Sequence, residues 1–129
     1  LVFINSDNSL KPSKHFLAYN ASKAAGLQMA RTIASEFGKY KIRANSILPG
    51  AVFGGSKMWT AELREARAAI HGFDPALLEE EYKKNNALGV IIDPSEIAEL
   101  AVFLASERSA KMTGNALVID GGGVGTYVR

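Results

Sequence analysis

Short apolar segments alternate with longer amphipathic segments along this chain, and that alternation limits the folds open to it. Residues 1–5, 42–48 and 116–119 have the composition of strands, whereas apolar residues recur at helical spacing over 18–37 and 94–105. Two further helical segments, 57–70 and the residues after Asp74, lie between the second and third strands. The predicted order is therefore β-α-β-α-α-α-β, which favours an α/β fold with a parallel sheet and right-handed crossovers.

Residues at the segment ends support these boundaries. Asp93 precedes a proline and stands three residues before Glu96, as in a capping box. Asp74 also precedes a proline, so it predicts a second helix start, and that short helix should be largely solvated. Gly38 is placed to end the long helix.

The first strand predicts that the chain is an excerpt of a longer protein. Residues 1–4 are apolar without alternation, which is typical of a strand buried on both faces, and no initiator Met precedes them. We expect this strand to pair with the second strand on one side and with a missing strand on the other. Alone, it would expose an apolar edge.

Composition narrows the class of protein. The 129 residues fit one domain or part of one, and a net charge of +2 argues against nucleic acid or an anionic membrane as a partner. The chain has no cysteine, so thiolate catalysis and cysteine-ligated zinc are excluded, and a reducing, cytoplasmic location is expected. His15 and His71 are predicted to be surface residues, and no metal site is predicted. No apolar run is long enough to span a bilayer.

Tyr19 and Lys23 are the first candidates for chemistry. They stand four residues apart near the start of the long helix and so share one face of it. An ammonium beside a phenol stabilises the phenolate, so such a pair can act as a general acid and base near neutral pH. Ser6 follows the carboxyl end of the first strand, where ligands bind in parallel sheets, and its hydroxyl could hold a substrate oxygen.

Each of these residues also has an ordinary structural explanation. Many helices carry a half-buried tyrosine and a lysine four residues later, and a lone loop serine is more often a turn former. Context favours the functional interpretation: Ser6 stands thirteen residues before Tyr19, and 18–25, 42–50 and 113–122 carry further motifs in order. Together they resemble the short-chain dehydrogenase/reductase family over almost the whole chain.

The resemblance implies the C-terminal, catalytic half of a Rossmann-like, doubly wound parallel sheet, with residues 1–129 forming that half. It implies that Tyr19 exchanges a proton with the substrate oxygen, that Lys23 assists it, and that Ser6 holds that oxygen. NAD or NADP would contact Tyr19, Lys23, Pro49, Gly50 and Val52, with Gly50 allowing close backbone approach. The phosphate-binding fingerprint would lie upstream, since the glycines at 121–123 follow the last strand.

Two features depart from the family pattern or extend it. Gly54 stands where many members carry a threonine, and Ser56 is a possible substitute. Residues 57–86 correspond to a substrate lid; the alternative is a solvated pair of helices. Within the lid, Lys57, Trp59 and Arg64 are candidates to recognise an anionic substrate. The family also implies a homo-oligomer formed through the Tyr19 helix and the last helix and strand.

The stretch 51–59, followed by a charged helix, resembles a narrower group. It is similar to the dehydrogenase part of the bifunctional rhamnulose-1-phosphate aldolase/alcohol (lactaldehyde) dehydrogenases, which implies an upstream aldolase and a small alcohol, aldehyde or sugar-derived substrate. Two alternatives stay open: a ketoacyl reductase of the same family and a non-catalytic binding relative. The 129 residues alone are expected to be inactive.

Overall fold

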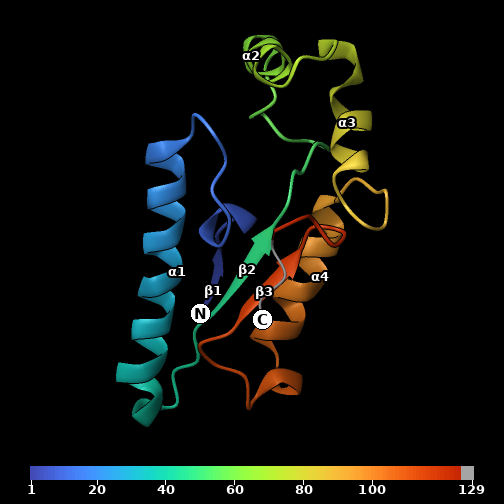
Figure 1. Cartoon of the computed structure of the whole chain (residues 1–129). Helices are drawn as coiled ribbons and strands as arrows, with labels where there is room; N and C mark the ends of the chain where they lie inside the picture. The colour runs from blue at the N-terminus through green and yellow to red at the C-terminus, as the bar shows by residue number, and fades with distance from the viewer. Residues whose placement is uncertain (126–129) are drawn as a thin grey trace.

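The computed structural model describes residues 1–125 and is built on a three-stranded parallel sheet (Figure 1). The strands β1 (Val2–Ile4), β2 (Asn45–Pro49) and β3 (Ala116–Ile119) lie in the order β1-β2-β3. The register pairs Phe3 with Ser46 and Ile47 with Leu117. The predicted parallel sheet and the pairing of the first two strands are confirmed.

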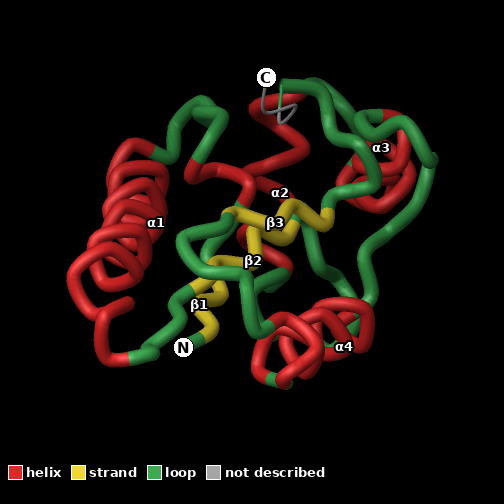
Figure 2. The backbone as a smooth tube through the Cα atoms, turned by 90° about the horizontal axis from the view of Figure 1, so that it is seen from below, coloured by secondary structure: helices red, strands yellow, loops and turns green. Residues whose placement is uncertain are grey.

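Helices α1 (Leu17–Phe37) and α4 (Pro94–Ala105) cover opposite faces of this sheet, as the view along the strands shows (Figure 2). Helices α2 (Ala61–His71) and α3 (Leu78–Lys84) stand together beyond the carboxyl ends of the strands. Four short 3-10 helices complete the described chain: Asp7–Ser9, Gly38–Tyr40, Pro75–Leu77 and Glu107–Ser109. The observed order of strands and α-helices is the predicted one.

The core forms where both helices press on the central strand. All five residues of β2 are buried, because α1 and α4 cover its two faces and β1 and β3 flank it. The apolar face of α1 contributes Leu27, Ala30 and Ala34, and α4 contributes Leu104. No helix within residues 1–125 is both long enough and apolar enough to cross a membrane.

Strand β2 starts at Asn45, later than the predicted 42–48, and the Arg43 side chain before it bonds the end of α4. Its guanidinium donates to the carbonyl oxygens of Leu104 and Ser106 at 2.9 and 3.1 Å. Arg43 is half-buried and Asn45 is 1% exposed, so both polar side chains are packed within the fold.

Strand β1 was expected to be buried on both faces, but Ile4 is 51% exposed. Within the described chain β1 forms the edge of the sheet, so one side of it has no neighbouring strand. This exposure agrees with the expectation that β1 alone would expose an apolar edge, and its burial by a further strand stays a prediction.

The helix boundaries agree with the cap signals, with one change of detail. The Asp93 capping box is formed: its backbone N–H donates to Glu96 Oε2 at 2.7 Å, and its carboxylate accepts from the Ser95 N–H at 2.8 Å. Helix α1 ends at Phe37 as predicted, but Gly38 keeps right-handed backbone angles and Lys41, at φ 62°, makes the left-handed turn.

Candidate active site

The candidate active site lies at the carboxyl ends of β1 and β2, where the chain places Ser6 and the turn after Pro49. Ser6 is 7% exposed and caps the short 3-10 helix Asp7–Ser9. Its hydroxyl accepts from the Asn8 N–H at 3.2 Å and donates to Asp7 Oδ1 at 3.0 Å. Asp7 in turn pairs with Lys11 at 3.0 Å. The Ser6 side chain is therefore held in one orientation by its own loop.

Hydrogen bonds join this loop to helix α1. The Ser9 hydroxyl donates to the backbone carbonyl of Lys23 at 3.0 Å, and Asn8 Nδ2 donates to Asn20 Oδ1 at 3.0 Å. Asn20 Nδ2 donates to the carbonyl oxygen of Ser13 at 2.9 Å. The loop that carries Ser6 is thus fixed against the two helical turns that carry Tyr19 and Lys23.

Tyr19 and Lys23 lie together on α1, as their spacing predicted. The Lys23 Nζ atom is 5.6 Å from the centre of the Tyr19 ring, and both side chains are half-buried. The ring of Phe16 meets Tyr19 edge-on at 6.1 Å. A phenol with an ammonium near its ring, both open in part to solvent, can take part in proton exchange with a bound molecule.

The turn after β2 packs closely against the loop after β3 at Gly50. A Cβ atom at Gly50 would lie 2.9 Å from Asp120 Cβ, so a side chain here would collide with the loop after β3. The Gly50 N–H also donates to the carbonyl oxygen of Ile119 at 2.8 Å. In this structure, packing against that loop is what requires a glycine.

Three aromatic side chains form a cluster that the sequence pattern did not reveal. Phe53 stacks on Trp59 with ring centres 4.5 Å apart, and Tyr82 meets both rings edge-on. The Trp59 indole N–H donates to the carbonyl oxygen of Val52 at 2.7 Å. This aromatic cluster joins the turn after β2 to α3. The only sequence signal was the presence of aromatic residues in a charged segment.

Two of the three residues expected to recognise an anion within 57–86 contact neighbouring residues of the chain. Arg64 pairs with Glu79 at 2.8 Å and so links α2 to α3, and Trp59 belongs to the aromatic cluster. Lys57 is exposed. Ser56, the possible substitute for a threonine at Gly54, accepts a local bond from the Met58 N–H at 3.3 Å. The helical pair is packed as well as solvated, since Ala68 and Leu78 are fully buried.

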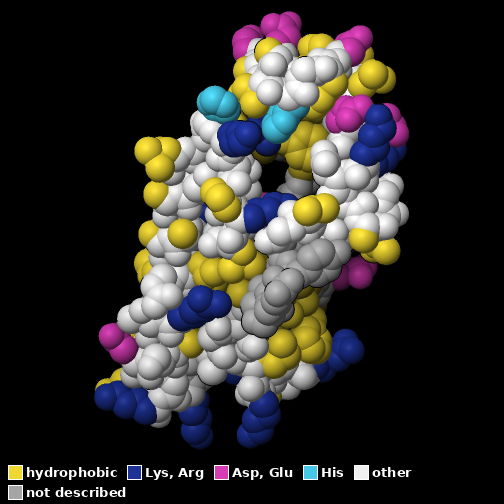
Figure 3. All heavy atoms as spheres, viewed as in Figure 1, with side chains coloured by type: hydrophobic (Ala, Val, Ile, Leu, Met, Phe, Trp, Pro, Cys, Tyr) yellow, Lys and Arg dark blue, Asp and Glu magenta, His cyan; other side chains and the backbone are white. Residues whose placement is uncertain are grey.

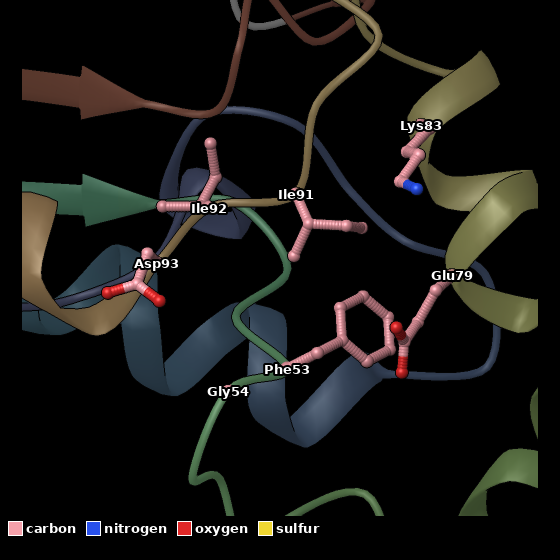
Figure 4. A pocket seen from close by; sticks show the side chains of 7 residues that line it. All are labelled: Phe53, Gly54, Glu79, Lys83, Ile91, Ile92 and Asp93. Atoms are coloured by element: carbon pink, nitrogen blue, oxygen red, sulfur yellow. The ribbon is translucent and has the colours of Figure 1, made fainter.

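A pocket of about 420 Å³ has Phe53 as one of its lining residues (Figure 4). Phe53 and Glu79 point toward one another across it, with Ile91 beside them and Asp93 at the far wall. Glu79 pairs with Arg64 and Lys83 pairs with Glu80, so its charged walls already have partners. Ser6, Tyr19 and Lys23 do not line this pocket, and we do not assign the chemistry to it.

Comparison with known proteins decides the family. A family model described as enoyl-(acyl carrier protein) reductase matches residues 1–123. A short chain dehydrogenase from Mycobacterium paratuberculosis, solved bound to NAD, is 30% identical with a TM-score of 0.79, covering 94% of this chain and 43% of that one. The chain belongs to the short-chain dehydrogenase/reductase family.

Two other similar proteins are much longer than the part that this chain matches. The uncharacterised oxidoreductase YuxG of Bacillus subtilis is 44% identical over all 129 residues, which make up 19% of its length. An actinorhodin polyketide ketoreductase solved with NADPH is 27% identical with a TM-score of 0.86, covering 98% of this chain and 47% of that one. This short-chain dehydrogenase/reductase chain thus spans less than half the length of each.

The residues of this family member that could hold a nicotinamide cofactor lie at one edge of the sheet. Lys23 and Tyr19 offer an ammonium and a hydroxyl that suit the hydroxyls of a ribose. The backbone turn from Pro49 to Val52 follows β2 at the same edge and is held by bonds from Gly50 and Trp59. A rigid turn beside polar side chains at the carboxyl ends of strands fits a cofactor of this kind.

Proposed function

We propose that this chain is the catalytic half of an NAD(P)-dependent enzyme that interconverts an alcohol and a carbonyl group of a small molecule. The observation that carries the proposal is the Tyr19–Lys23 pair on α1, to which the Ser6 loop is hydrogen-bonded. Support comes from relatives named as oxidoreductases and from structural neighbours bound to NAD or NADPH.

Tyr19, Lys23 and Ser6 would each have a separate role in the reaction. In alcohol oxidation the substrate hydroxyl gives its proton to the Tyr19 oxygen, while the carbinol carbon loses a hydride; reduction runs the same transfers backwards. A bound nicotinamide supplies the hydride acceptor or donor. Lys23 would assist Tyr19 and hold the cofactor ribose, and the turn of Pro49, Gly50 and Val52 would hold the nicotinamide.

Ser6 would hold the substrate oxygen, and the hydrogen bonds of its hydroxyl in this structure determine the direction of that contact. Its hydroxyl proton points to Asp7 Oδ1 in this structure, and a substrate alcohol gives its own proton to Tyr19, so Ser6 would hold the substrate oxygen by donating to it. Donation to a carbonyl oxygen requires the Ser6 hydroxyl to rotate away from Asp7. Asp7 therefore acts as a positioning residue for Ser6.

The complete protein would extend beyond this chain. We propose that a dinucleotide-binding half supplies the strand beside β1, that 57–86 closes over the substrate, and that the exposed Leu17 and Met29 of α1 support homo-oligomerisation. A fusion to an upstream aldolase, with lactaldehyde as a substrate, agrees with the great length of the Bacillus relative. We also propose that the complete protein is cytoplasmic.

A ketoacyl reductase is the second candidate within the same chemistry. The actinorhodin polyketide ketoreductase matches with a TM-score of 0.86, and the family model is described as an enoyl-(acyl carrier protein) reductase, a name that specifies an acyl group on a carrier protein. Substrate assays must therefore include a ketoacyl thioester as well as small alcohols and sugars.

The test is turnover by the complete protein with NAD or NADP. Reduced nicotinamide would be followed by absorbance with lactaldehyde, propanediol, a sugar panel and a ketoacyl thioester. Tyr19→Phe should abolish activity, while Tyr40→Phe, which removes an exposed hydroxyl just beyond the other end of α1, should not. Silence of the wild type, with no cofactor binding by calorimetry, would instead support a non-catalytic relative.

A further inference from the structure

Four basic side chains gather beside the candidate active site. Lys14 and His15 belong to the loop before α1, and Arg67 and His71 stand one turn apart on α2. The two histidines, in cyan, lie near each other on one face with basic side chains beside them, above a hollow between the α1 side and the helical pair (Figure 3). We call these four residues the basic group.

The basic group is close to Tyr19 through Phe16. The Arg67 guanidinium lies over the Phe16 ring at 4.6 Å, and the same ring meets Tyr19 at 6.1 Å. The Arg67 guanidinium is thus separated from the candidate proton donor by a single aromatic side chain. His15, at φ 65°, takes a left-handed backbone conformation that is uncommon for a residue other than glycine.

Among the described residues, no ion pair neutralises the basic group. The ion pairs found within residues 1–125 join Lys11 to Asp7, Arg64 to Glu79, Lys83 to Glu80 and Lys84 to Glu81, and none includes a member of the basic group. Arg67 instead donates to the uncharged Tyr82 hydroxyl at 2.7 and 3.1 Å. Partial burial lowers the pKa of His71, and the charges of Arg67, His15 and Lys14 lower it further.

We propose that the basic group binds the anionic end, a phosphate ester or a carboxylate, of a small substrate whose hydroxyl or carbonyl group reacts at Tyr19. The proposal rests on the proposed function. Arg67 offers a planar donor set that matches either anion, and a bound anion would favour protonated histidines. Because one aromatic ring separates the two sites, the substrate should have only a few carbon atoms between its anionic and reacting ends.

Kinetics of the complete protein test the proposal with matched substrates: glycerol, glycerol 3-phosphate and glycerate. Lys14→Gln and His71→Gln should raise the KM for an anionic substrate roughly tenfold, as expected for the loss of one charge-assisted contact, and leave kcat and the KM for glycerol unchanged. Lys39→Gln, an equal charge change just beyond the other end of α1, is the control. The phosphate and carboxylate arms show which anion is preferred.

A measurement without turnover separates the two proposals. Inorganic phosphate should raise the pKa of His71, followed by NMR of the imidazole in the complete protein, and the rise should be much smaller in Lys14→Gln. No change with phosphate or glycerate, or equal changes in Lys14→Gln and wild type, would overturn anion binding. Activity that survives Tyr19→Phe would overturn the proposed function instead, whatever the phosphate titration shows.

Discussion

The Arg43 guanidinium, two residues before β2, donates to the carbonyl oxygen of Leu104 in the last turn of α4 at 2.9 Å. It also reaches the carbonyl oxygens of Ser106 and Met112 and the hydroxyl of Ser109, each at 3.1 Å. One side chain thus satisfies carbonyl groups that the end of a helix leaves open, and it ties α4 to the central strand.

Arg43→Lys should lower the free energy of unfolding by about 2 kcal/mol, because an ammonium cannot reach four acceptors spread in the plane of a guanidinium. Urea unfolding of the complete protein, followed by circular dichroism, measures the change. Arg31→Lys, on an exposed part of α1, is the control and should leave the midpoint unchanged. Equal midpoints for the two variants would show that the Arg43 bonds contribute nothing specific.

Gly26 makes room for the side chain of Asn5. A Cβ atom at Gly26 would lie 2.5 Å from Asn5 Oδ1, and Asn5 Nδ2 donates to the Ser46 hydroxyl at 3.2 Å. Gly26→Ala should therefore cost about 1–3 kcal/mol of stability by overpacking the contact between α1 and the sheet.

Two further variants test this explanation. Gly38→Ala places its Cβ in open space at a right-handed φ of −55° and should be neutral or slightly stabilising. In an Asn5→Ala background the cost of Gly26→Ala should shrink, which a double-mutant cycle in urea would measure. An unchanged cost in that background would rule out Asn5 as the cause.

Trp59 should hold the segment 57–86 against the turn after β2. Trp59→Phe keeps an aromatic ring for Phe53 but removes the donor to Val52, so we expect a loss of about 1 kcal/mol. Limited proteolysis within 57–86 should then be faster, and the KM for substrate should rise more than kcat falls. Trp59→Leu should exceed Trp59→Phe in both effects. Identical behaviour of the wild type and both variants would show that the Trp59 indole does not hold this segment.

The folded protein should hold His71 with a pKa below the ordinary histidine value, first because of partial burial and then because of Arg67, His15 and Lys14. The unfolded chain then binds its proton first as the pH falls. The stability contributed by neutral His71 is therefore full above the ordinary histidine value and declines as the pH drops through and below it.

NMR titration of the His71 imidazole checks the direction. In Lys14→Gln the pKa of His71 should move up toward the ordinary value, and in Lys39→Gln it should stay where it is. A wild-type value at or above that of an unfolded peptide would contradict the arrangement of the basic group.

Local spacing was enough to predict the order of strands and helices, the Asp93 cap and the meeting of Tyr19 with Lys23. Each depends on residues within a turn or two of one another, so the backbone geometry of a single element determines the outcome. The ends of the parallel strands likewise predicted where Ser6 would lie.

Contacts between distant segments could be decided only by the tertiary structure. Arg43 with Leu104, Gly50 with Asp120, Phe53 with Tyr82 and Arg67 with Phe16 each join parts of the chain that no periodic pattern relates. The same polar or aromatic residue can be exposed or buried, depending on which element packs against it, and that packing follows from how the helices settle on the sheet. For that reason neither the Arg43 bonds to the end of α4 nor the close packing of Gly50 against Asp120 could be predicted from the sequence.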